Sequence, residues 1–190
     1  MGEPARKPAA YEDLHGLPEN MTGEIVNGEL FATPRPSSLH THAASVLGIE
    51  VGPAYHFGRG GPGGWVILDE TEILLGENLL VPDLAGWKRE RFPGGPKENW
   101  ISVSPDWVCE VLSPRTARLD KVRKMPVYAR YAVPHLWLVD PAARTLDVFT
   151  LSDGKWVLSA SFGEDDRVRA EPFADIEFEL NNLWLHEAPL

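Results

Sequence analysis

The fold is decided between residues 107 and 140, a segment that begins with WVCEVLSP (107–114) and reaches LWLV (136–139) near its end. Both apolar runs have the length of buried strands, and Ser113-Pro114 ends the first of them. Between the two runs, a basic amphipathic segment extends to Tyr131. The succession of strand, helix and strand indicates one mixed α/β domain in which helices cover a sheet.

Glu110 is the one charged residue inside the first of these strands. An ionised carboxylate in a buried strand is costly unless a cation or hydrogen-bond donors hold it. Buried acids of this kind are often functional. The alternative is a structural glutamate at a strand end, paired with a nearby arginine or lysine. Cys109 alternates with Glu110, so we expect it on the opposite face of the sheet as a core thiol.

Asp83 is a second acid within an apolar stretch, LLVPDLA (79–85), which we expect to form a strand. The alternative is a turn aspartate after Pro82. If the strands of Asp83 and Glu110 are neighbours in one sheet, their carboxylates converge. Two converging carboxylates suit a hard cation such as Mg²⁺, with water completing its coordination.

The basic segment after Ser113 places Asp120, Lys124, Tyr128 and Tyr131 at spacings of four, four and three residues. On a helix, residues with this spacing share one face. Because the helix follows the Glu110 strand directly, we expect the Lys124 ammonium within about 4–6 Å of the Glu110 carboxylate. The alternative is an ordinary ion pair between Asp120 and Lys124. Pro126 interrupts the pattern and predicts either a kink or a new helix start.

The rest of the chain predicts an N-terminal hairpin, a helix and a C-terminal strand meander. The hairpin spans residues 23–31 and turns at Asn27-Gly28, which favours a two-residue turn. A helix is expected to begin at Ser37 or Ser38, and two long strands are expected over 65–75 and 79–87. The meander turns at Asp153-Gly154. We expect residues 1–10 to form a disordered tail and residues 11–190 to form one domain.

Composition limits the classes of function. The net charge is −10, yet residues 88–131 hold ten basic and five acidic residues, which predicts a local anion-attracting patch. A charged helix face on an acidic protein is the alternative. The single cysteine excludes a disulfide framework and a cysteine zinc site. No apolar run approaches the length of about 18 residues that a membrane span needs, and the N-terminus lacks a secretory signal, so we expect a cytoplasmic protein.

Several short motifs resemble the Uma-two family of endonucleases, within the PD-(D/E)XK, restriction-endonuclease-like superfamily. The resemblance extends over roughly residues 11–185, and the order and spacing of its motifs make it specific. The matching positions are EIVNGEL (24–30), His40, VPDLA (81–85), EVLSP (110–114), Asp120, Lys124, Tyr128 and VPHLWLVDP (133–141).

The resemblance implies a restriction-endonuclease-like core, with a mixed sheet flanked by helices and with Asp83 and Glu110 as metal ligands. Leu112 stands two residues after Glu110, so the literal E-x-K motif is absent. Lys124 matches a lysine that the family has moved to the following helix. Glu24 matches an N-terminal acid of the family that faces the same site. His40 matches a further family position and is a candidate to touch a site carboxylate; a core or surface histidine is the alternative.

The function that we predict is metal-dependent hydrolysis of DNA phosphodiester bonds by a homodimer. Asp83, Glu110 and the Val111 carbonyl would hold Mg²⁺ or Mn²⁺, and Lys124 would position the attacking water. Contacts with the DNA backbone are expected from Arg115, Arg118, Lys121 and Arg123. One alternative is a non-catalytic dimeric scaffold or DNA-binding module that keeps the nuclease fold. Another is a metal phosphoesterase for small nucleotides.

Overall fold

The strand that carries Glu110 lies in the middle of a six-stranded sheet. The computed structural model describes residues 7–92, 94–95 and 98–185. The strand order is β10-β9-β8-β7-β6-β3. The bounds are β3 (Trp65–Asp69), β6 (Leu84–Lys88), β7 (Trp107–Val111), β8 (His135–Asp140), β9 (Thr145–Ser152) and β10 (Lys155–Gly163). Strands β7 and β8 are parallel and the other neighbouring pairs are antiparallel, so the sheet is mixed.

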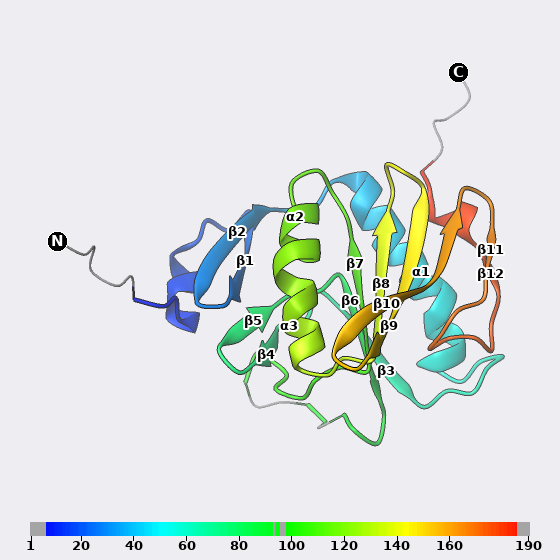
Figure 1. The fold of residues 1–190 in the computed structure, drawn as a ribbon, viewed down its shortest axis with the longest axis horizontal. Coiled ribbons are helices and arrows are strands. Elements are labelled where there is room, and N and C mark those ends of the chain that lie inside the picture. Colours follow the sequence, from blue (N-terminus) through cyan, green and yellow to red (C-terminus); the bar gives the residue numbers. More distant parts are fainter. Residues whose placement is uncertain (1–6, 93, 96–97, 186–190) are drawn as a thin grey trace.

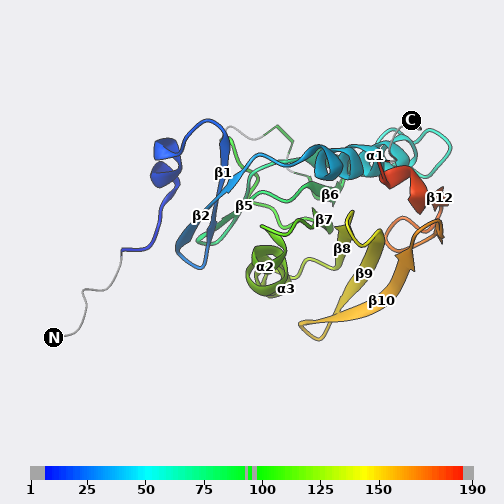
Figure 2. The same ribbon diagram turned by 90° about the horizontal axis from the view of Figure 1, so that it is seen from above.

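A helical crossover connects the parallel strands β7 and β8, because parallel neighbours cannot be joined by a tight turn. It consists of α2 (Ala117–Leu119), a π-helical turn η2 (Asp120–Lys124) and α3 (Met125–Arg130). The three pieces run on as one rod across the sheet (Figure 1). The other face of the sheet is covered by α1 (Ser38–Tyr55), so the sheet lies between two helical layers (Figure 2).

The alternation of side chains along β7 divides the core into two parts. Cys109 packs on the α1 side, in a cluster with Leu47 and Phe173. Val108 packs on the crossover side, in a cluster with Tyr128. The prediction that Cys109 and Glu110 point to opposite faces is confirmed, and Glu110 consequently lies under the crossover helix.

The N-terminal hairpin belongs to a second sheet, of four strands, with the order β2-β1-β5-β4. Its strands are β1 (Met21–Val26), β2 (Glu29–Pro34), β4 (Ile73–Leu75) and β5 (Asn78–Leu80). Asn27 and Gly28 have φ values of 51° and 75°, as the predicted two-residue hairpin turn requires. Through Ile25, β1 pairs with Leu79 of β5, which brings the hairpin beside the segment that leads to Asp83.

The two long strands predicted over residues 65–75 and 79–87 are each broken, so this expectation was wrong. Strands β3 and β6 belong to the large sheet, whereas β4 and β5 belong to the small one. The first break coincides with Glu70, whose φ of 42° no strand residue adopts. The second break is at Val81-Pro82, where proline offers no donor for a ladder. Asp83 therefore lies directly before β6 and not inside a strand.

The chain termini pack against this frame. In the 3₁₀ helix η1 (Tyr11–Gly16), the Tyr11 hydroxyl donates a hydrogen bond to Glu72 Oε2 at 2.9 Å, which connects η1 to the residue directly before β4 of the small sheet. Residues 1–6 of the predicted tail lie outside the described residues. The predicted meander forms as β9 and β10, and after it come β11 (Arg167–Val168), β12 (Phe178–Glu179) and the 3₁₀ helix η3 (Leu180–Leu183) beside α1. In the described part of the chain, no helix is both long and apolar enough to cross a membrane.

Phe173 offers a test of the core on the α1 side. Its buried ring lies 4.7–5.6 Å from the ring centroids of Tyr55, Trp65, Trp107 and Trp137. Phe173→Ala is expected to lower the free energy of unfolding by about 3–5 kcal/mol, measured by urea denaturation. Phe57→Ala is the matched control, because 64% of Phe57 is exposed, and a change below about 0.5 kcal/mol is expected. Equal effects of the two substitutions would contradict this account of the core.

Candidate active site

A buried ion pair between Glu110 and Lys124 is the centre of the site. The Lys124 Nζ lies 2.8 Å from Glu110 Oε1 and 2.9 Å from Oε2, and each residue is 2% exposed. The predictions that Glu110 is buried and that the Lys124 ammonium lies near its carboxylate are both confirmed. The Glu110 carboxylate is not an unbonded group facing Asp83, because the Tyr128 hydroxyl also donates a hydrogen bond to its Oε1, at 2.6 Å.

Lys124 is surrounded by further acids from different parts of the chain. Glu24, on β1, approaches the ammonium to 2.8 Å, and Asp120, one helical turn earlier, approaches it to 3.6 Å. Glu24 also has a structural contact, because its Oε1 accepts a hydrogen bond from the Val81 backbone N–H at 2.7 Å. The ammonium also donates to the Val81 carbonyl at 3.4 Å. The hairpin, the central strand and the crossover helix therefore meet at one lysine.

This excess of carboxylates sets the protonation of the group. Burial lowers the pKa of Lys124, but the carboxylates of Glu110, Glu24 and Asp120 outweigh it, so the pKa is well above its usual value and the ammonium stays charged. Burial raises the pKa of Glu110 well above its usual value, and Lys124 only partly offsets this while the neighbouring acids add to it. For the same reasons burial and Glu24 raise the pKa of Asp120 to about 6, against the opposing effect of Lys124.

Pro126 does not swing Lys124 outward. The helix widens into the π turn of η2, in which the Met125 N–H donates to the Asp120 carbonyl, and α3 then begins with Pro126 in its first turn. Proline lacks a donor and clashes with the carbonyl four residues earlier, and a wider turn relieves that clash. Pro126 predicted either a kink or a new helix start, but the structure has neither: a π turn accommodates the proline within one continuous helix.

Asp83 is held at the edge of the site by the strand and by α1. Its Oδ2 accepts a hydrogen bond from the Val111 backbone N–H at 2.6 Å, and its Oδ1 lies 3.3 Å from His40 Nε2. Ser37 caps α1 and accepts a hydrogen bond from the His40 N–H, which places His40 in the first turn. Burial lowers the pKa of His40, but Asp83 and the Val111 backbone outweigh it, so the pKa is raised. His40 does touch a site carboxylate.

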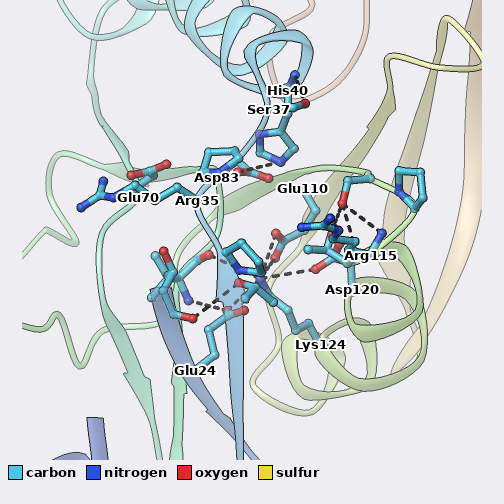
Figure 3. Close-up of a pocket in the computed structure, with 18 residues that line it drawn as sticks. Glu24, Arg35, Ser37, His40, Glu70, Asp83, Glu110, Arg115, Asp120 and Lys124 are labelled. Carbon is cyan, nitrogen blue, oxygen red and sulfur yellow. Dashed lines mark hydrogen bonds and ion pairs between the residues drawn. The ribbon is translucent and has the colours of Figure 1, made fainter. Parts of the chain in front are cut away.

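These side chains line a cavity of about 420 Å³ that opens to the surface. Figure 3 shows His40 and Asp83 above the group formed by Glu110, Lys124 and Glu24. In this view Arg35 and Glu70 lie on one side of that group, and Arg115 and the buried Asp120 lie on the other. The cavity thus has a strongly acidic floor around one ammonium, and in this view an arginine lies on each side of the group.

The oxygen atoms that these residues offer are of the chemical type that a hard cation binds. Asp83 and Glu110 supply carboxylate oxygens and Val111 a carbonyl oxygen, which are the ligands that Mg²⁺ and Mn²⁺ prefer. The surplus of acids over the single buried ammonium also favours an added positive charge. No group of three or more histidine, cysteine, aspartate or glutamate side chains in the described residues is arranged to hold a metal ion. A cation would therefore depend on two carboxylates, the carbonyl and water.

The predicted DNA-contacting residues all lie on the exposed side of the crossover: Arg115, Arg118, Lys121 and Arg123. Arg115 lines the cavity, whereas Arg123 forms a loose, exposed pair with Glu29 at 3.7 Å. Sequence reasoning missed Arg35, whose only signal is its position between Pro34 and Pro36, directly after the hairpin. It also gave Tyr128 no role, although the four-residue spacing from Lys124 places it on the same helix face.

The comparisons with known proteins agree with this geometry. The sequence model of the Uma2 family, described as "Putative restriction endonuclease", matches residues 8–182, and the chain belongs to this family. Its fold is similar to the crystal structure of "a putative nuclease belonging to DUF820" from Anabaena variabilis ATCC 29413, with a TM-score of 0.74 and 22% identity. That similarity covers 93% of this chain and 97% of the other. No curated protein matches the sequence. The predicted restriction-endonuclease-like fold is thereby confirmed, and the chain is a member of a nuclease family.

Asp120 provides a test of the charge surplus through pH. The folded protein keeps the Asp120 proton up to about pH 6, whereas an unfolded aspartate loses it near pH 4. Stability therefore falls as the pH rises through this window and remains lower above it. Asp120→Asn removes this effect. As the pH rises from 4 to 8, the free energy of unfolding of wild type is therefore expected to fall by about 3 kcal/mol relative to that of the variant. Urea unfolding at the two pH values measures this change, and a pH-independent difference would contradict it.

Proposed function

We propose that the protein is a metal-dependent endonuclease of the PD-(D/E)XK type that hydrolyses DNA phosphodiester bonds. The observation that carries the proposal is the contact of Lys124 with Glu110, in a cavity that Asp83 also lines. Although Leu112 replaces the motif lysine, the Lys124 ammonium of the following helix contacts the Glu110 carboxylate, which supports the proposal. A carboxylate pair beside a lysine, with arginines at the opening, is suited to a phosphodiester group.

Each residue has a distinct part in this proposal. Asp83, Glu110 and the Val111 carbonyl would hold Mg²⁺ or Mn²⁺, which when bound polarises a phosphate oxygen and lowers the pKa of water. His40 and the Val111 N–H fix the orientation of Asp83. Tyr128 fixes that of Glu110. Lys124 orients water and stabilises negative charge at the phosphate, while Glu24 and Asp120 keep its ammonium charged and in place.

The positive charges outside the cavity extend the site along the nucleic acid. Arg115 at the opening and Arg118, Lys121 and Arg123 on the exposed helix surface are suited to backbone phosphates, which carry no sequence information. They offset locally the net charge of −10. The buried, single Cys109 supports a reducing compartment, and we propose that the enzyme acts in the cytoplasm.

A second candidate function is a non-catalytic DNA-binding or scaffold module that keeps the nuclease fold. It is favoured by one observation: both oxygens of Glu110 are already bonded to Lys124 and Tyr128. In that case the ion pair serves the stability of the core and the acids bind no cation. Calorimetry with Mn²⁺ separates the two functions. An enzyme is expected to bind Mn²⁺ and to lose this binding in Asp83→Asn, whereas the non-catalytic module binds no Mn²⁺ in either form.

Plasmid DNA with Mg²⁺ or Mn²⁺ tests the proposed activity. Wild type is expected to nick or cut the plasmid, and Glu110→Gln is expected to lose at least about 100-fold in rate, because the carboxylate charge is removed at nearly constant shape. Glu77→Gln, an exposed glutamate outside the cavity, is the matched control and should retain the wild-type rate. Thermal unfolding of both variants verifies that they fold. If wild type and Glu110→Gln behave identically, the enzyme proposal is wrong.

We further propose a homodimer of the single domain formed by residues 11–190. Cutting both strands of a duplex needs two active sites, and a two-fold dimer provides them in the symmetry of the DNA. Sedimentation velocity is expected to give a mass near twice the chain mass of 21.1 kDa. A monomeric mass at micromolar concentration would contradict the dimer without affecting the site.

A further inference from the structure

A second cavity, of about 410 Å³, lies next to the proposed active site. The two cavities share the residues His40, Glu70 and Asp83 as lining. They therefore adjoin at these three residues, and the second cavity is called the groove below. The first cavity holds Glu110 and Lys124, and the second leads away from them between α1 and β3, the edge strand of the large sheet.

The walls of the second cavity carry little charge along most of its length. On α1 the lining includes Ala44, Ser45, Gly48 and Gly52, and on β3 it includes Ile67. Glycine in a helix costs about 1 kcal/mol relative to alanine. At Gly52 an added Cβ would meet no atom within 4 Å, so packing does not require glycine there, although the following Pro53 disfavours a β-carbon in the helical conformation. The absent side chain leaves room in the groove.

The far end of the second cavity presents an aromatic ring to solvent. Phe57 follows α1 directly, lines the cavity and is 64% exposed. The Arg59 guanidinium lies over its ring at 5.0 Å from the centroid. The His56 ring also contacts Phe57, at 4.6 Å between centroids, so the ring is partly covered by Arg59 and His56. An exposed aromatic ring next to an arginine is an arrangement that single-strand-binding proteins use for bases and backbone.

The charges along the groove are ordered. Asp69 and Glu70 lie at the end where Asp83 lies, and Arg59 lies at the other end beside Phe57. Arg59 would meet a phosphate of the strand, the neutral walls would pass the sugars, and the acidic end would adjoin the phosphate to be cut only with the proposed cation bound. The end at Phe57 and Arg59 is thus suited to one base and its phosphate.

We propose that this groove binds an unpaired stretch of DNA beside the phosphate to be cut, with Phe57 stacking on a base. This inference rests on the proposed nuclease function and names its substrate as a junction between paired and unpaired DNA. Inside a duplex both faces of a base are covered by its neighbours, so Phe57 could insert there only by unstacking a base step, whereas an unpaired base offers its face without that cost. The groove thus favours cleavage beside unpaired segments, such as flaps, overhangs and the locally unpaired stretches of a supercoiled plasmid.

A peptide strand added to the edge of β3 would be another occupant of a groove between a helix and an edge strand. The structure disfavours it, because the Ile67 N–H already donates to His56 Nδ1 at 3.1 Å. The edge donor that a docking strand would use at this point is taken.

Fluorescence anisotropy tests the groove independently of cleavage. The probes are a labelled single strand of about 16 nucleotides and the same sequence as a blunt duplex, each in Ca²⁺. Phe57→Ala is expected to weaken binding of the single strand about tenfold and that of the duplex little, while Phe57→Trp restores it. Gly52→Leu is expected to weaken single-strand binding at least as much, and Gly52→Ala is its matched control, because it meets the same constraint from Pro53 without filling the groove. Ile49→Ala, exposed on α1 and outside both cavities, is the control.

The outcomes separate this inference from the proposed function. Equal single-strand affinity of wild type, Phe57→Ala and Gly52→Leu would overturn the groove as a DNA site, even if the plasmid is cut; a peptide groove would give that result. Loss of affinity confined to the duplex would also overturn it. A selective loss of single-strand affinity in a protein that does not cut DNA would support the groove and refute the nuclease.

Discussion

The ammonium of Lys124 is the interaction on which the arrangement of the other elements depends. It is bonded to acids from β1, β7 and η2 and to the carbonyl of Val81, two residues before Asp83. Hairpin, central strand, crossover helix and the approach to β6 are therefore fixed relative to one another by one charge. Removal of either partner of a buried ion pair leaves an uncompensated charge, which costs several kcal/mol. The same network that lines the proposed active site also closes the interface between the two sheets.

The contacts of Lys124 bear both on the stability of the core and on the proposed active site. For stability alone, an apolar contact of similar volume would serve as well as a buried ion pair or better. The acids surrounding Lys124 and the hydroxyl on Glu110 instead hold charged groups in one geometry beside an open cavity. A side chain whose charge is kept in the core at a cost in stability is characteristic of a functional site. His40 extends the same principle to the α1 side, because it orients Asp83 from the opposite layer.

Local signals in the sequence predicted much of the fold and of the site. The turns at Asn27-Gly28 and Asp153-Gly154, the cap at Ser37 and the burial of Glu110 follow from preferences within a few residues. The contact of Lys124 with Glu110 could be predicted because a short connection joins strand and helix. The position of Asp83 outside a strand and the placement of Arg35 could not be predicted. They depend on the pairing of Ile25 with Leu79, 54 residues apart, and on the division of strands between two sheets, which no local pattern encodes.

The π turn before Pro126 has a consequence for comparing this chain with its relatives. Such a turn holds one residue more than the α-helical turn it replaces. Here Lys124 stands 14 positions after Glu110. A relative with an unbroken α-helical crossover brings its lysine over the same carboxylate with one position fewer between them. Alignments that conserve spacing would then pair this lysine with a neighbour that points elsewhere, and only superposition of the helices would show the two ammonium groups to be equivalent.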